Sequence, residues 1–493
     1  MSAGKSMLPA DARQGSPFAE APPSRFAQVD AWLAKCSEWL NPILVKETRQ
    51  ALKSRQFLLT FTLLLVFGWA WSLLYLSMRF YEMQEGVFYA PHGAAMLAGY
   101  FWILGFPMVV IVPFTAFRSL SAEREDGTYE LVAITSLSPR QIIGGKLGSA
   151  VLQMLIYMSA LAPGMAFTYM LRGVDLLFIL LGCFYLFLIS IFVSVLGLLL
   201  ATVTSSRHWQ MVLGVIYILA VFWLYVMLGA ATYGFIESGQ AMPFDEPHFW
   251  RAQGNILFAY GGYLALFYLA AMARITFVSD NRSTKLRIAM TALQTFAIGW
   301  ALYWWLLFDD SDARHVFAVL AWWSCANWAV FGLMMVGESA EMSPRVHRGL
   351  PQSFLGRMLL TWLNPGPGTG YMLMCVVSLT LLATTVLTYV VSNALHMRQA
   401  LQQEELLAAA FVAAYLMLYV GLIRLAMLVF NRFTQGGIYL SGLLGVLLVL
   451  TAVIAPVVVV GLIQYLTDAY RGDFTILHVS NPFWVLYAAA SND

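Results

Sequence analysis

The chain has 493 residues, of which 60% are hydrophobic and only 11% charged, and its mean hydropathy is +0.72. This composition excludes a soluble globular protein, in which charged residues make up about a quarter of the chain. The net charge of +2 comes from basic and acidic residues that are scattered along the sequence, so it gives no indication of nucleic-acid binding. The composition predicts a polytopic membrane protein.

The N-terminal part has two sections. Residues 1–38 contain prolines, serines and alanines but no apolar core of a signal peptide, which predicts a flexible cytoplasmic tail. From Pro42 onward the sequence fits an amphipathic helix lying in the cytoplasmic membrane interface, because Pro42 suits a first helical turn. Its apolar stripe consists of Ile43, Leu44, Thr48, Ala51 and Leu52, and the other positions hold Lys46, Glu47, Arg49, Gln50, Lys53 and Arg55.

Long apolar runs follow. A helix needs about 20 apolar residues to cross the hydrocarbon core. Such runs occupy roughly residues 57–77, 94–117, 147–171, 176–203, 211–234, 256–278, 288–308, 316–336, 371–391, 405–429 and 438–463. The segment 476–490 is interrupted by Asn481 and Pro482, and a twelfth crossing there stays open. Because the runs are continuous and do not alternate, they predict an all-α helical membrane protein and not a barrel.

The distribution of basic residues predicts the orientation. If the N-terminus is cytoplasmic, 22 of the 28 basic residues lie in cytoplasmic segments or adjoining helix ends. The six that remain outside are Arg79, Arg172, Arg251, Arg314, Arg398 and Arg471. Cytoplasmic loops of membrane proteins are enriched in Lys and Arg, so this asymmetry favours eleven crossings with the C-terminus outside.

The spans form two blocks. Residues 39–278 hold the predicted interfacial helix and six spans, and residues 279–493 hold a second membrane block of about five helices. A basic segment, Ser279–Arg287, links the two. We therefore predict a six-helix domain followed by a five-helix domain whose role the sequence does not indicate.

One charged stretch, SAEREDGTYE (Ser121–Glu130), stands between two apolar spans. Ser121 is placed to cap a short helix that carries Glu123, Arg124 and Glu125, and Gly127 is placed to end it. Such an element presents both signs of charge and suits docking to a partner protein. A solvated loop is the alternative that the residues alone leave open.

The residues around this stretch resemble the permeases of type-2 (exporter) ABC transporters. That family has an E-R-E-x-G-T-x-E-L loop after its second helix, then a Leu-Ser-Pro turn and a Gly-Lys pair. The matching positions are Glu123, Arg124, Glu125, Gly127, Thr128, Glu130 and Leu131, followed by Leu137, Ser138, Pro139, Gly145 and Lys146. The resemblance covers about residues 39–278.

The resemblance implies a function and partners. It implies a multi-pass subunit of a bacterial inner membrane that works as a homodimer, or as a heterodimer with a second permease. A separate ABC ATPase would dock on Glu123, Arg124, Glu125, Gly127, Thr128 and Glu130, and ATP-driven closure of the ATPase would move the helices. The family also has short re-entrant helices before the last span, a position that residues 241–255 occupy here.

The chain carries no sign of its own chemistry. A search for a P-loop, an H-E-x-x-H or a G-x-S-x-G sequence finds none, and the four cysteines and seven histidines lack metal-ligand spacing. We therefore expect no enzyme activity, cofactor or metal, and we expect the ATPase to be another polypeptide. A membrane-embedded enzyme, a secondary carrier and a non-transporting scaffold remain alternatives. The few ionisable residues in the spans weigh against a carrier and favour an apolar or amphiphilic cargo over an ion.

The orientation can be tested by labelling single cysteines from either side of the membrane. We expect residues 2, 141, 284 and 352 to react from the cytoplasmic side and residues 240, 311 and 399 from the outside, since this arrangement keeps most cations in the cytoplasm. Two or more positions labelled from the wrong side would overturn the predicted topology.

Overall fold

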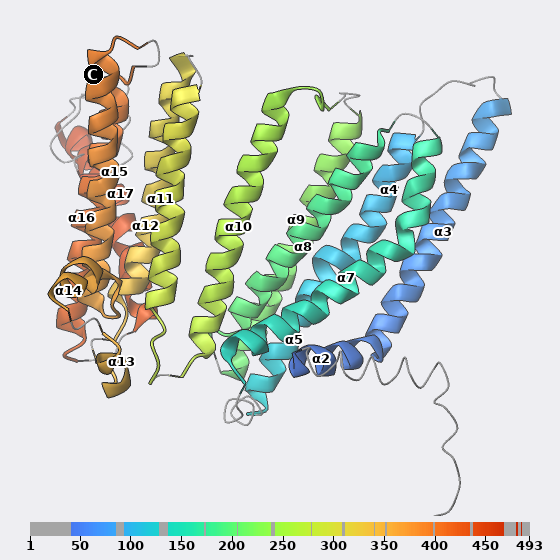
Figure 1. The fold of residues 1–493 in the computed structure, drawn as a ribbon, viewed down its shortest axis with the longest axis horizontal. Helices are drawn as coiled ribbons and strands as arrows, with labels where there is room; N and C mark the ends of the chain where they lie inside the picture. Colours follow the sequence, from blue (N-terminus) through green and yellow to red (C-terminus); the bar gives the residue numbers. More distant parts are fainter. Residues whose placement is uncertain are drawn as a thin grey trace, which may run out of the picture. The chain divides into compact units, whose positions relative to one another are not determined.

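The computed structural model describes residues 41–84, 93–127, 137–171, 174–204, 206–237, 242–277, 279–307, 311–339, 341–350, 353–397, 400–433, 437–467, 480, 481 and 485. Over these ranges the chain forms helices and no strand, which confirms the all-α prediction (Figure 1). The helices in the first half are α2 (Pro42–Leu52), α3 (Arg55–Gln84), α4 (Gly93–Gly105), η1 (Phe106–Ile111), α5 (Val112–Glu125), α7 (Pro139–Met170), α8 (Leu176–Ala201) and α9 (Arg207–Glu237).

The second half continues the series. Its elements are α10 (Pro247–Ile275), α11 (Thr284–Leu307), η2 (Ser311–Arg314), α12 (His315–Val336), α13 (Pro344–Arg348), α14 (Phe354–Leu360), η3 (Thr361–Leu363), α15 (Pro367–Ala394), α16 (Gln403–Phe430) and α17 (Ile438–Thr467). Within the described ranges, ten helices are long and apolar enough to cross a membrane. The predicted span 288–308 is helical, as α11, but is not among the ten. The exact number of crossings stays a prediction.

The chain divides into two compact units. The first comprises Met1–Ser119, Ala133–Ile191 and Val221–Ile236, and the second comprises Leu120–Val132, Phe192–Ala220 and Glu237–Asp493. These units differ in extent from the two sequence blocks, whose boundary near residue 278 stays a prediction.

The span that begins with α4 forms the centre of the first unit. α4, η1 and α5 run without a break from Gly93 to Glu125, and this is the most buried of the candidate spans. Pro107 lies at the start of η1 and lacks a backbone N–H, which explains a local π-helical turn in an otherwise α-helical ladder. The hydroxyl of Ser190 on α8 donates to the Met108 carbonyl there, and the Tyr225 hydroxyl donates to the Trp102 carbonyl at 3.1 Å.

The predicted amphipathic helix is confirmed as α2. It begins at Pro42 after Asn41, whose side chain accepts a hydrogen bond from the Ile43 N–H at 3.1 Å, and it leads into the start of α3 (Figure 1). Ile43 is buried against Gly145 of α7, where an added Cβ would lie 2.8 Å from the Ile43 Cβ and 2.9 Å from the Leu44 backbone nitrogen. The two helix backbones therefore approach so closely that position 145 has room only for glycine.

The second unit has its core where α12, α15 and α16 pack together, around Trp328 and Met374. At the start of α11, Arg287 is 1% exposed and fixes the chain that precedes α15. Its guanidinium donates to the carbonyls of Trp362 and Gly366 at 3.1 and 2.8 Å and pairs with Glu338 at 2.7 Å. These partners satisfy the two terminal nitrogens of the buried guanidinium, whereas its Nε has no hydrogen-bond partner among the described residues.

One implied feature is absent from the described residues. Residues 247–255 do not form a separate re-entrant helix, because α10 runs continuously from Pro247 to Ile275. Pro247 occupies its first turn, and the Trp250 indole N–H donates to the Phe244 carbonyl at 2.8 Å, which folds the preceding turn onto the helix start. The continuous helix α10 stands where the resemblance implied short re-entrant helices.

The close approach of α2 and α7 predicts a graded response to alanine. Gly145→Ala should lower the free energy of unfolding by about 1–3 kcal/mol, because the clash includes backbone atoms that cannot move aside. The Cβ added by Gly148→Ala contacts only the flexible end of the Leu44 side chain, so this variant should lose less free energy of unfolding than Gly145→Ala. Gly261→Ala on α10 meets nothing within 4 Å and should be neutral or stabilising.

Denaturant unfolding of the purified chain in detergent micelles measures all three variants. Equal losses at positions 145 and 261 would contradict the proposed close contact.

Candidate functional site

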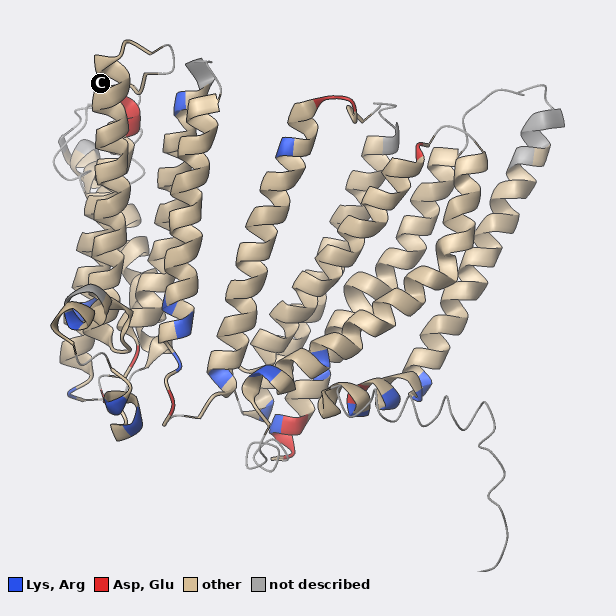
Figure 2. Cartoon of the chain, viewed as in Figure 1, with Lys and Arg blue, Asp and Glu red and all other residues tan. Residues whose placement is uncertain are grey.

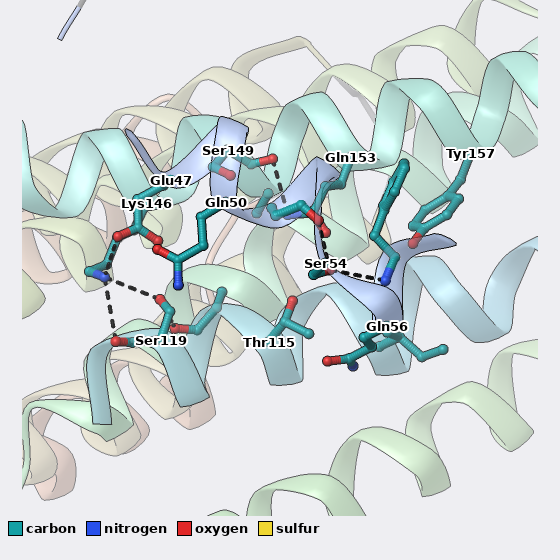
Figure 3. Close-up of a pocket in the computed structure, with 15 residues that line it drawn as sticks. Glu47, Gln50, Ser54, Gln56, Thr115, Ser119, Lys146, Ser149, Gln153 and Tyr157 are labelled. Carbon is teal, nitrogen blue, oxygen red and sulfur yellow. Dashed lines mark hydrogen bonds and ion pairs between the residues drawn. The ribbon is translucent and has the colours of Figure 1, made fainter. Parts of the chain in front are cut away.

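A polar pocket of about 170 Å³ lies in the first unit where α2, α5 and α7 meet (Figure 3). Its polar lining residues are Glu47, Gln50, Ser54, Gln56, Thr115, Ser119, Lys146, Ser149, Gln153 and Tyr157. A water molecule takes about 30 Å³ in the liquid, so the pocket has room for several waters but not for a drug-sized ligand. Such a pocket suits a hydrated joint between helices.

A buried ion pair holds this joint together. The Lys146 ammonium lies 3.0 Å from a Glu47 carboxylate oxygen, with the two side chains 2% and 12% exposed. The same ammonium donates to the Ser119 hydroxyl at 3.3 Å and approaches the Ser119 carbonyl at 3.5 Å (Figure 3). One cation thus bridges three helices, since Glu47 belongs to α2, Ser119 to α5 and Lys146 to α7.

Local capping places the two helices that carry the pair. Ser138 caps α7 through its hydroxyl, and the Gln141 side-chain oxygen accepts a hydrogen bond from the Ser138 N–H at 2.9 Å, which completes a capping box. The Asn41 amide, which caps α2, also donates to the Gln141 carbonyl. The starts of α2 and α7 are therefore tied to each other.

The predicted docking residues lie on the last turn of α5. Glu123, Arg124 and Glu125 belong to this helix, and Figure 2 shows acidic and basic residues together at its end. Arg124 donates to the carbonyl of Ala201, the last residue of α8, at 3.3 Å. Thr128 and Glu130, the other two predicted site residues, lie outside the described residues.

The predicted cap at Ser121 is wrong. α5 continues through this position to Glu125, so Ser121 lies within the helix and not at its start, and its side chain is fully buried. Its neighbours Phe117 and Leu120 are also buried, so the apolar face of the span extends further than the apolar run in the sequence. The prediction for Gly127 is confirmed, because its φ of +68° is the left-handed conformation that ends helices.

The sequence prediction missed the pairing of Glu47 with Lys146. A signal was present, because Glu47 lies four residues after Ile43 and four before Ala51, in line with the apolar stripe of α2. Lys146 likewise lies three and four residues after Ile143 and Ile142, both buried on α7. An acid and a base that each occupy a buried helical face are expected to find partners.

The Lys146 contacts link α2, α5 and α7 mechanically. Over the part of the chain that the structure describes, no three His, Cys, Asp or Glu side chains gather in a way that could hold a metal ion. The pair in the pocket is charge-balanced, and its hydroxyl partner lies beside an ammonium, which is not a base. Comparisons of the chain with protein-family models, with curated proteins and with solved structures found no match.

The ion pair predicts a clear double-mutant cycle. Lys146→Met should lower the free energy of unfolding by about 3 kcal/mol, because it leaves the Glu47 carboxylate buried without its cation. Adding Glu47→Leu to Lys146→Met should restore most of that loss, since replacing both partners by apolar groups is often neutral. Chemical unfolding in micelles provides the measurement. Additive losses in the double variant would show that the pair does not couple α2 to α7.

Proposed function

We propose that the chain is the membrane-spanning permease subunit of an ATP-driven exporter, coupled to a separate ABC ATPase. The support comes from the match of Glu123, Arg124, Glu125 and Gly127 to the loop of type-2 ABC permeases, and from the ten long apolar helices. In this proposal the stretch 121–131 is the docking element. The chain acts as a homodimer, or as a heterodimer with a second permease, in a bacterial inner membrane.

The observation that carries the proposal is the continuity of α5. This helix joins a buried span to a charged end. A force applied at Glu123 would therefore be transmitted along a continuous helix and not lost in a flexible loop. Ser119 lies about one turn before Glu123 and is held by Lys146, which also holds Glu47 of α2. Movement of the end of α5 would therefore reach α2 and α7 as well.

The left-handed glycine supplies a second support. Gly127 turns the chain directly after the charged helix end, and no described residue lies within 4 Å of the position where its Cβ would be. The requirement for glycine here comes from the backbone conformation alone. A charged helix end followed by a sharp turn presents a compact surface to a partner, whereas an extended linker would not.

Docking can be tested with Glu123→Ala, which removes a charged side chain without removing the Arg124 bond to Ala201. We expect the affinity for the co-expressed ATPase to fall by about 1–3 kcal/mol, the range for hydrogen bonds to charged groups. Arg140→Ala, at the start of α7, is the matched control on the same side and should have little effect. Pull-down of the ATPase measures docking, and ATP-dependent export measures the transport that depends on it.

The turn is tested by Gly127→Val against Gly127→Asn. Valine resists positive φ and should weaken coupling, while asparagine tolerates it and should retain most activity. Normal insertion with full ATPase binding and full export in Glu123→Ala and Gly127→Val would refute the docking role. Binding of the ATPase without any substrate export would instead identify the chain as a scaffold.

A further inference from the structure

The second unit contains a larger pocket of about 610 Å³, within the usual range for small-molecule sites. Its walls come from the last turns of α8 and α10, the first turns of α11 and α17, and the end of α12. Most of the lining is apolar, and this apolar wall includes Leu199, Leu266, Phe267, Met290, Met334 and Met335. Methionine side chains adapt to irregular shapes, so this wall suits a flexible hydrocarbon chain.

Arg274 and Glu341 line this pocket, and the part of the chain that the structure describes contains no ionic partner for either. Arg274, in the last turn of α10, donates to the Val203 carbonyl at 2.8 Å and contacts the Tyr439 hydroxyl at 3.1 Å, and no carboxylate pairs with it among the described residues. Glu341 also lines the pocket, is exposed and has no cation partner over the same ranges.

The other acids of the lining are already occupied. Glu338 pairs with Arg287 at 2.7 Å and accepts a hydrogen bond from the Ser283 hydroxyl at 2.6 Å. Asp280 pairs with Arg345 at 2.9 Å. Arg282 also lines the pocket and donates to the Phe277 carbonyl at 3.1 Å. Arg274 and Glu341 are the cation and the carboxylate that we consider for a ligand beside the apolar lining.

We propose that this pocket holds one zwitterionic phospholipid, with its phosphate at Arg274, its headgroup amine at Glu341 and an acyl chain along the methionine-rich wall. Arg274 lies in the last turn of α10 and Glu341 lies between α12 and α13, and basic pockets between membrane helices bind lipid headgroups. The Val203 carbonyl and Tyr439 hydroxyl hold the guanidinium in place before the lipid arrives. This inference is independent of the proposed exporter function.

Native mass spectrometry of the full chain in detergent, titrated with dioleoyl phosphatidylethanolamine, tests the proposal. The wild-type chain should retain one lipid, and Arg274→Gln should weaken its binding about tenfold through loss of a charged hydrogen bond. Arg251→Gln removes a cation at the opposite end of the same helix and should leave binding unchanged. Equal effects of the two variants, or no retained lipid in the wild-type chain, would overturn the proposal.

Two further variants test the wall and the headgroup. Met334→Trp fills the pocket and should abolish retention, whereas Val319→Trp on an exposed position of α12 should not. The wild-type chain should prefer phosphatidylethanolamine over phosphatidylglycerol by about threefold, and Glu341→Gln should remove the preference. Retention by Met334→Trp at the wild-type level, or stronger binding of phosphatidylglycerol, would overturn the assignment. Melting curves of each variant confirm that it is folded.

Discussion

An unpaired backbone amide in hydrocarbon costs several kcal/mol, and this cost shapes the whole chain. With 60% hydrophobic residues, the sequence can satisfy its amides only within its own segments, so the described residues form one long helix after another. The same low dielectric decides where charge is tolerated. The ionisable residues therefore lie mainly at helix ends (Figure 2). The buried Lys146 and Arg287 pair with Glu47 and Glu338, which come from other segments of the chain.

Lys146 and Arg287 show two ways to keep a buried cation. Lys146 is a point charge that meets one carboxylate and one hydroxyl, which suits a joint between three helices. The planar guanidinium of Arg287 contacts one carboxylate and several carbonyls, and this geometry suits the fixing of a loop in one conformation. Both cations bring together segments that lie far apart in the sequence. Their role is to define which helix faces meet.

Local patterns in the sequence were enough to predict most helices, because span length and amphipathic periodicity are local properties. The start of α2 at Pro42 and the left-handed Gly127 follow from single residues. The end of α5 was not predictable in this way. The sequence becomes polar there, yet one face of the helix remains buried at Phe117, Leu120 and Ser121. The contact of Glu47 with Lys146 joins residues 99 positions apart, and only tertiary packing shows which acid meets which base.

The arginines of the second unit illustrate how one side chain serves either fold or recognition. A guanidinium enclosed by a carboxylate and carbonyls, as in Arg287, has its charge neutralised and most of its donors used. A guanidinium that contacts a neutral carbonyl and a hydroxyl, and has no carboxylate partner among the described residues, as in Arg274, is not neutralised by a counter-ion there and is still fixed in direction. Because an uncompensated, oriented cation beside an apolar wall attracts an anionic group with a hydrocarbon tail, the difference in partners separates a structural arginine from a ligand-binding one.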